Sequence, residues 1–249
     1  MARTFVAASS QNLEGTAPVT AVPCTFAAWM YKTDDAANLQ GVAIGDVVGG
    51  GGGRLSLIYS ATEVVQAQAV GVGGTDTASS SASGSLNAWV HGAAVFASST
   101  SRTAYLNGGN AGSETSSNTQ SGIDTVRIGQ VALSGGAFGD GSVAEAAVWD
   151  IDLTAAEVAV LAKGVSPLFV RPANLVAYWP LIGRHSPEPD IVGGFNLTLT
   201  NVPANFAHPR VIYPCGPKIT PFVAAASGRV WKLAGLGGGL AGERGSLAA

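Results

Sequence analysis

Charged residues are scarce in this sequence. Only 12% of the 249 residues are Asp, Glu, Lys or Arg, about half of the roughly 25% that is usual in soluble domains. The 13 basic and 16 acidic residues give a formal net charge of -3. A protein that binds nucleic acid needs clustered Lys and Arg to neutralise phosphates. We therefore expect no nucleic-acid partner.

Long apolar runs are missing as well. The chain is 47% hydrophobic with a mean hydropathy of +0.29, yet no run approaches the roughly 18 consecutive apolar residues of a membrane-spanning helix. Much of the apolar total is alanine, so we expect no membrane partner. Residues 1–11 carry one positive charge and no apolar stretch of the kind a secretory signal needs. We expect no conventional export signal.

The sequence also lacks the common motifs of catalysis and metal binding. It contains no Gly-x-Ser-x-Gly elbow and no Gly-Lys pair of a phosphate-binding loop. His91, His185 and His208 are scattered, and none stands at metal-ligand spacing from Cys or another His. Cys24 and Cys215 permit one disulfide without requiring it.

Glycine is abundant, and the 34 glycines separate short runs of β-branched and aromatic residues. This rhythm predicts an antiparallel sandwich or barrel. The predicted strands span residues 25–31, 41–45, 55–59, 64–70, 89–96, 102–106, 125–129, 141–150, 174–181 and 195–200. Within 64–70, Val65, Ala67 and Ala69 share one face by the period of two. Asn107-Gly108 closes the hairpin region with residues that tolerate positive φ.

One short helix is predicted. Thr154 and Glu157 have the spacing of a capping box. Val158, Leu161 and Ala162 follow at helical spacing, and Lys163-Gly164 provides a basic last turn and a glycine stop. We expect a helix of two or three turns here, in a chain that is otherwise all-β.

The chain changes character after residue 202. Five prolines fall between 203 and 221, and a Gly/Leu/Ala-rich stretch follows. We therefore divide the chain into a sandwich domain over 1–202 and a C-terminal extension over 203–249. A tryptophan flanked by cations often anchors an interface. We expect the extension to dock on a partner or on a second copy of the chain through Arg229, Trp231, Lys232, Leu233, Leu236 and Leu240.

Four of these segments, taken together in order, resemble the laminin G-like, concanavalin A-like jelly-roll superfamily in its bacterial or phage form. They are Thr25-Phe26-Ala27-Ala28-Trp29, the Trp89-Val90-His91 strand, the hairpin strand ending Tyr105-Leu106-Asn107-Gly108, and the 141–149 strand leading into Leu153-Thr154-Ala155-Ala156-Glu157. The resemblance covers roughly residues 1–200. It implies two curved antiparallel sheets packed face to face, in a superfamily whose members bind carbohydrates, bind proteins, serve as structural modules or, in some cases, hydrolyse glycosides.

Catalysis and calcium binding find little support. Retaining jelly-roll glycosidases need two carboxyl groups about 5.5 Å apart, and no Glu-x-Asp-x-Glu pattern occurs; Glu145, with Asp150 and Asp152 beyond it, comes nearest. Because the resemblance also implies a calcium site in some members, the loop acids Asp34, Asp35, Asp46, Asp76 and Asp140 are candidate ligands, although their spacing fits no calcium loop. We interpret His91 as a packed sheet histidine and Trp29, Trp149 and Trp179 as core residues. No enzyme and no cofactor are predicted.

The functional expectation follows from a mismatch between the resemblance and the chain. Domains of this kind usually work outside cells, whereas no export signal is recognised. A phage particle resolves the mismatch, because its proteins are made in the host cytoplasm and released by lysis. We expect a non-enzymatic virion component, on a capsid or tail, that contacts other virion subunits or itself and also cell-surface glycans. The alternative is an exported bacterial carbohydrate-binding module or adhesin that works extracellularly.

Overall fold

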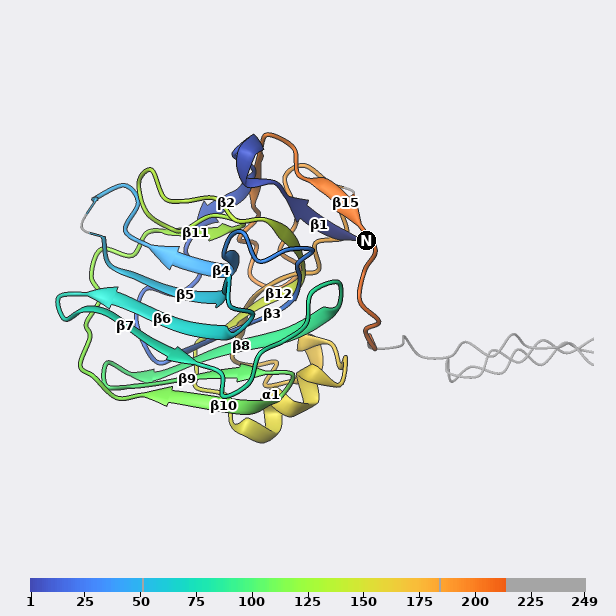
Figure 1. Cartoon of the computed structure of the whole chain (residues 1–249). Coiled ribbons are helices and arrows are strands. Elements are labelled where there is room, and N and C mark those ends of the chain that lie inside the picture. The colour runs from blue at the N-terminus through green and yellow to red at the C-terminus, as the bar shows by residue number, and fades with distance from the viewer. Residues whose placement is uncertain (51, 184, 214–249) are drawn as a thin grey trace, which may run out of the picture. The chain divides into compact units, whose positions relative to one another are not determined.

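The β-branched runs fold as strands of two antiparallel sheets. The computed structural model describes residues 1–50, 52–183 and 185–213 (Figure 1). Its elements in chain order are β1 (Ala2–Phe5), η1 (Ala7–Ser9), β2 (Asn12–Thr16), β3 (Cys24–Tyr31), β4 (Leu39–Gly45), β5 (Arg54–Tyr59), β6 (Val65–Gly71), β7 (Gly74–Ser79), β8 (Trp89–Ser98), β9 (Ser101–Leu106), β10 (Gly109–Glu114), β11 (Thr125–Ile128), β12 (Gly141–Trp149), α1 (Ala155–Ala162), η2 (Pro167–Phe169), β13 (Leu175–Trp179), β14 (Thr198–Thr200) and β15 (Ala204–Phe206).

The two sheets lie face to face as a sandwich. The first has the order β10-β9-β8-β3-β12-β1-β15, with β13 also paired to β12, and the second has the order β14-β2-β11-β4-β5-β6-β7. All the named strand pairs are antiparallel, for example β3 with β8 and β5 with β6. The sandwich predicted from the sequence is therefore confirmed.

Alternation along each strand divides its side chains between two environments. In β6, Val65, Ala67 and Ala69 are buried while Gln66 and Gln68 are only half-buried, as the period of two predicts. The main core fills the space between the sheets. A second, smaller core lies on the outer face of the first sheet, where Val158 and Leu161 of α1 cover Trp149 and its neighbours.

The predicted helix forms where the capping box places it. The Thr154 side chain accepts a hydrogen bond from the Glu157 amide, and the Glu157 carboxylate accepts one from the Thr154 amide. In the described part of the chain no helix is both long and apolar enough to cross a membrane.

Five strands, β1, β2, β7, β10 and β15, fall outside the predicted runs. The strand β10 follows directly from the turn at Asn107 and Gly108, whose φ values of 52° and 75° suit a two-residue hairpin turn. The strand β15 belongs to the expected C-terminal extension, yet it pairs with β1. The first sheet thus continues past residue 202, and the rest of the extension, from 214 onward, lies outside the described residues.

A buried ion pair fastens β1 to the segment that precedes β15. The Arg3 guanidinium lies 2.8 Å from the Glu188 carboxylate and also donates to the carbonyl oxygens of Pro203 and His185. The Arg3 and Glu188 side chains are 5% and 0% exposed. Removing one member of such a pair leaves a buried charge without compensation.

We expect Arg3→Met to lower the free energy of unfolding by about 3 kcal/mol, because the Glu188 carboxylate then stays buried and unpaired. Urea denaturation measures the loss, with one m-value, the dependence of the unfolding free energy on urea concentration, fitted to both proteins. The double variant Arg3→Met/Glu188→Met is the control, and it should recover part of the lost stability. Equal stability of Arg3→Met and the unaltered chain would contradict the assignment.

Candidate functional site

Three aromatic rings meet at one end of the first sheet. Tyr31 at the end of β3 is the register partner of Trp89 at the start of β8, and their ring centroids lie 5.6 Å apart. Phe206 of β15 packs 4.8 Å from Tyr31 and 6.1 Å from Trp89. All three side chains are half-buried, so their rings still meet solvent. We call these three residues the aromatic trio.

A groove of about 170 Å³ opens beside Tyr31 and Phe206 of the trio. Two hydroxyl groups on its wall, from Thr4 and Ser142, are hydrogen-bonded to each other at 2.7 Å. The remaining lining residues are Phe5, Val6, Thr33, Asp34, Asp140 and Gly141. The groove therefore combines aromatic faces with a few hydroxyl and carboxylate groups, the usual composition of a small-molecule site.

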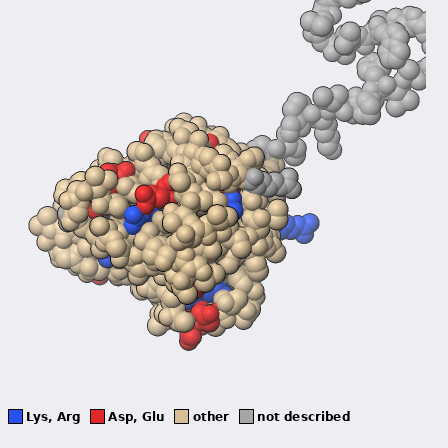
Figure 2. All heavy atoms as spheres, turned by 90° about the horizontal axis from the view of Figure 1, so that it is seen from above, with Lys and Arg blue, Asp and Glu red and all other residues tan. Residues whose placement is uncertain are grey.

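Both groove carboxylates are partly fixed by backbone amides. Asp140 accepts a hydrogen bond of 2.7 Å from the amide of Ala7, and Asp34 accepts one of 3.1 Å from the amide of Ala36. Asp34 is exposed and Asp140 half-buried. Charged side chains form only small, separate groups on the face shown in Figure 2.

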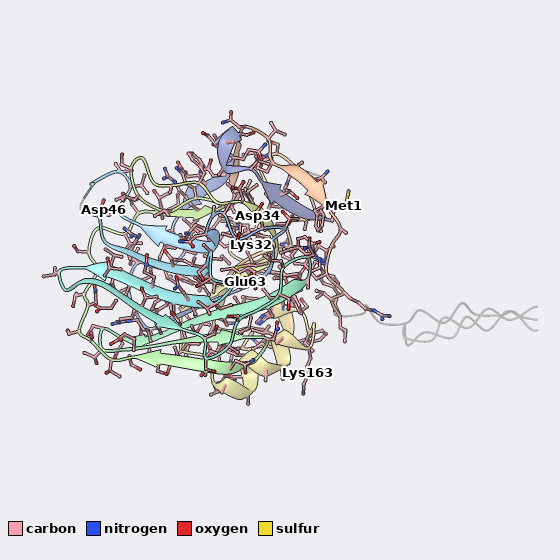
Figure 3. All side chains as sticks on the ribbon, viewed as in Figure 1. Met1, Lys32, Asp34, Asp46, Glu63 and Lys163 are labelled. Carbon is pink, nitrogen blue, oxygen red and sulfur yellow. The ribbon has the colours of Figure 1, made fainter. Side chains whose placement is uncertain are left out.

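Lys32 lies directly behind the groove but is turned away from it. Its Nζ donates to the Ser60 carbonyl at 2.9 Å and lies 5.6 Å from the centre of the Tyr59 ring. Burial lowers the pKa of Lys32, and the nearby carboxylates of Asp34, Asp35, Glu63 and Asp140 oppose that shift. Figure 3 shows Lys32, Asp34 and Glu63 close together and Asp46 well apart from them.

The carboxylate of Glu145 lies deep on the outer face of the first sheet. A register shift between Ala144 and Ala147 places one extra residue in β12, and Glu145 takes a φ of 55° there. Such a bulge redirects a side chain to the other face of the sheet. Glu145 is 3% exposed as a result, although alternation from buried Val143 would aim it into the main core.

The Glu145 carboxylate holds the chain segment that follows Phe206. It accepts hydrogen bonds from the hydroxyl groups of Tyr178 and Tyr213, and it lies 3.0 Å from Nε2 of His208. His208 and Tyr213 come from the segment just after β15. We call Glu145, His208 and Tyr213 the latch, because together they fasten this segment, and with it Phe206, to the sheet.

The surroundings shift the pKa values of the two nearby histidines in opposite directions. Burial lowers the pKa of His208, but its hydrogen bond to Glu145, the charge of that carboxylate and its hydrogen bonds to the carbonyl oxygens of Pro209 and Pro180 together outweigh burial and raise the pKa. His91 lacks such a partner and packs edge-on against Trp29 at 5.4 Å. Burial alone therefore lowers the pKa of His91 to about 3. A cavity of about 10 Å³, bordered by Trp29, His91 and Glu145, has room for about one water molecule.

Sequence comparison places this fold among known families. The model of the concanavalin A-like lectin/glucanases superfamily matches residues 6–159, more than half of the chain. The chain belongs to this superfamily. No sequence among the curated proteins matches it.

Solved structures share the superfamily fold at low identity. A candidate carbohydrate-binding protein from Bacteroides ovatus is 18% identical, with a TM-score of 0.55 over 80% of this chain and 57% of its own. The CBM40 of the Ruminococcus gnavus IT-sialidase, bound to alpha2,3 sialyllactose, is 13% identical, with a TM-score of 0.52 over 65% and 98%. The enzymatically active domain of tailspike protein 2 from bacteriophage CBA120 is 16% identical, with a TM-score of 0.50 over 73% and 31%. The chain thus spans little more than half of the Bacteroides protein.

Within this superfamily fold, several residues singled out from the sequence have a definite place. His91 is 2% exposed, which confirms a packed sheet histidine, and Trp149 and Trp179 are fully buried. Trp29 is only half-buried and faces outward, so its assignment to the core is wrong. The alternation of β3 explains the difference, because Phe26, Ala28 and Met30 take the inner face.

The loop acids considered as calcium ligands do not come together. Asp34 and Asp140 share the groove, whereas Asp76 contacts Asn118 at 2.7 Å. In the described ranges no group of three or more His, Cys, Asp or Glu side chains has a geometry suited to a metal ion.

Three further expectations concern other parts of the chain. Asp150 accepts a hydrogen bond from Asn174 at the end of β12. Cys24 is fully buried, which raises its pKa, and Cys215 lies outside the described residues. The expected docking residues, Arg229, Trp231, Lys232, Leu233, Leu236 and Leu240, also lie outside them.

The signal for the groove was present but dispersed along the sequence. Its lining comes from β1, from β3 and the loop after it, from the start of β12 and from β15. The aromatic residues 31, 89 and 206 are separated by more than fifty residues each, and only strand order brings them together.

The latch makes stability depend on pH in a defined direction. The pKa of His208 in the folded state lies above its unfolded value of 6.5. Its stabilising charge is therefore fully present below pH 6.5 and is lost as the pH rises through the folded-state pKa. We expect His208→Gln to be less stable than the unaltered chain near pH 6, with a difference that shrinks as the pH rises through the folded-state pKa of His208. Urea denaturation across this range measures it.

His91→Gln provides a control with the opposite sign. The folded-state pKa of His91 lies near 3, below its unfolded value of 6.5. Between these two values the unfolded chain binds a proton at His91 and the folded chain does not, so the free energy of unfolding decreases as the pH falls below 6.5. The variant should therefore reduce acid destabilisation. A His208→Gln difference that grows with rising pH would refute the pairing with Glu145.

Proposed function

We propose that this protein is a non-enzymatic, lectin-like module that binds a carbohydrate in the groove beside the aromatic trio. The carrying observation is the composition of that groove: exposed faces of Tyr31 and Phe206 next to the hydroxyl groups of Thr4 and Ser142 and two carboxylates. A sugar ring has an apolar face suited to an aromatic ring and hydroxyl groups suited to hydrogen bonding. The superfamily and the Bacteroides ovatus protein support the same class of ligand.

Binding without turnover accords with the positions of the acids. A glycosidase needs a second carboxylate within about 5–10 Å of the first. Asp150 lies just after the end of β12, five residues beyond Glu145, and accepts a hydrogen bond from Asn174 there. The oxygens of Glu145 are engaged by two tyrosines and His208.

The particle on which this module works is the second part of the proposal. We propose a place on the surface of a phage virion, on capsid or tail, where the sandwich displays its groove to host glycans. Three points support this: the shared fold with a domain of a phage tailspike, the low charge of the chain, and an extension rich in leucine and glycine. Self-assembly or docking through that extension would distinguish a virion subunit from an exported bacterial module.

We expect Phe206→Ala to weaken glycan binding at least tenfold, about 1.4 kcal/mol, because it removes one aromatic wall of the groove. A glycan array followed by calorimetry on the best ligand measures the change. Phe169→Ala is the matched control, since Phe169 is 52% exposed and lies on η2 away from the groove. Equal losses in the two variants would contradict the site.

The assembly part predicts a difference in mass. We expect the full-length chain to form a defined oligomer and a chain ending at Pro217 to be monomeric, as measured by light scattering. The shortened chain keeps Phe206, His208 and Tyr213, so its sandwich and groove remain complete. If both chains are monomers, the extension is no self-assembly element, and the exported glycan-binding module becomes the better description.

A further inference from the structure

We infer that the groove selects neutral or amino sugars and rejects sugars that carry a carboxylate. This inference rests on the proposed glycan binding and adds the class of sugar. It follows from two observations: carboxylates line the groove, and the nearby basic side chains of Lys32 and Arg3 do not.

Among the lining residues, Asp34 and Asp140 are the only ones with a carboxyl group, and none is a Lys, Arg or His. Asp34 is exposed and Asp140 half-buried, so both reach the groove as solvent-accessible carboxylates. Every other lining residue is aromatic, aliphatic, glycine or a hydroxyl-bearing side chain. A ligand in the groove therefore meets negative charge and no positive charge from the lining.

The neighbouring cations are committed elsewhere. Lys32 stands between the lining residues Tyr31 and Thr33 in the chain, and its charge interacts with Asp34 and Asp140. It is nevertheless 1% exposed, donates to Ser60 and does not line the groove. Arg3 is 4% exposed and its guanidinium contacts Glu188 and two carbonyl oxygens.

His208 is a third cation close to the groove. His208 lies two residues after Phe206, and its imidazole is paired with Glu145. Its positive charge is thereby compensated within the latch. Lys32, Arg3 and His208 are thus all absent from the lining of the groove, whereas sites for acidic ligands rely on Arg or Lys.

The consequence for recognition is a difference in affinity rather than in shape. A sugar carboxylate placed against the trio would face two like charges, which acts against that class of ligand. Sugar hydroxyl groups instead donate to the carboxylates, which only accept hydrogen bonds when ionised. An ammonium group gains further, because it pairs with a carboxylate and is attracted by the face of an aromatic ring.

The test is an array of the full-length protein against oligosaccharides that share a backbone and differ in charge. Each of the gluco, galacto and manno series includes a neutral member, a member with a free amine and a member with a carboxylate. We expect binding in at least one series, with the carboxylated member at least roughly tenfold weaker than the neutral one. The double variant Asp34→Asn/Asp140→Asn should narrow this gap at least threefold. Asn at 140 keeps the Oδ1 that accepts the Ala7 amide.

The double variant Asp150→Asn/Asp152→Asn is the matched control for net charge, since both residues are exposed beyond the opposite end of β12; it should leave the preference unchanged. Carboxylated members that bind as tightly as neutral ones overturn the inference while glycan binding itself stands. An unchanged gap in the Asp34→Asn/Asp140→Asn variant also overturns it, because the discrimination then arises elsewhere. No binding by any member of any series overturns the proposed function, and the inference with it.

Discussion

The architecture of the groove depends on one buried carboxylate. Glu145 sits on a bulge of β12 and gathers Tyr178, Tyr213 and His208 around it. An ionised carboxylate with few donors is expensive to bury, so its position is stable only when these partners are present. The dependence is mutual. The segment after β15 supplies hydrogen-bond donors to the buried Glu145 carboxylate, and these same hydrogen bonds hold the segment against the sheet. Phe206 lies two residues before His208, so these contacts also fix the position of Phe206.

The ion pair of Arg3 and Glu188 reinforces the same arrangement from the other side of β15. Arg3 donates to the Pro203 carbonyl immediately before that strand, whereas the latch lies immediately after it. A strand of three residues at a sheet edge has few ladder hydrogen bonds of its own. Fixing both of its ends with charged, buried contacts is what allows such a short strand to present an aromatic ring with a defined orientation.

Sequence patterns predicted most of the sandwich but little of the groove. Strands such as β3 and β6 can be predicted from the sequence because their side chains alternate between the two faces of the sheet. The strand β10, with the sequence Gly-Asn-Ala-Gly-Ser-Glu, has almost no side chains to pack and owes its existence to the hairpin turn at Asn107-Gly108. The prolines near β15 suggested a departure from the domain, whereas long-range pairing with β1 retains that segment.

The site itself escaped prediction for two physical reasons. The bulge at Glu145 reverses the face expected from alternation, and nothing local in Gly-Ser-Val-Ala-Glu-Ala-Ala-Val-Trp marks the extra residue. The groove is assembled from segments far apart in sequence, so its composition depends on strand order. Asp34 and Asp140 were visible as loop acids, but only as candidates for calcium, because their separation in sequence hid their shared setting beside aromatic rings.

Because the chain has few charged residues, Asp34 and Asp140 have a larger electrostatic effect on the groove than they would in a domain of ordinary composition. In a domain of ordinary composition, many surface charges surround any groove and the effects of individual carboxylates are averaged by neighbours and by salt. Here 12% of the residues are charged, and Lys32 and Arg3 beside the groove are buried in contacts of their own. The two carboxylates are therefore the charged side chains that a ligand meets on the lining of the groove. The scarcity of charge thereby makes the proposed preference of the groove among sugars a matter of electrostatics as much as of shape.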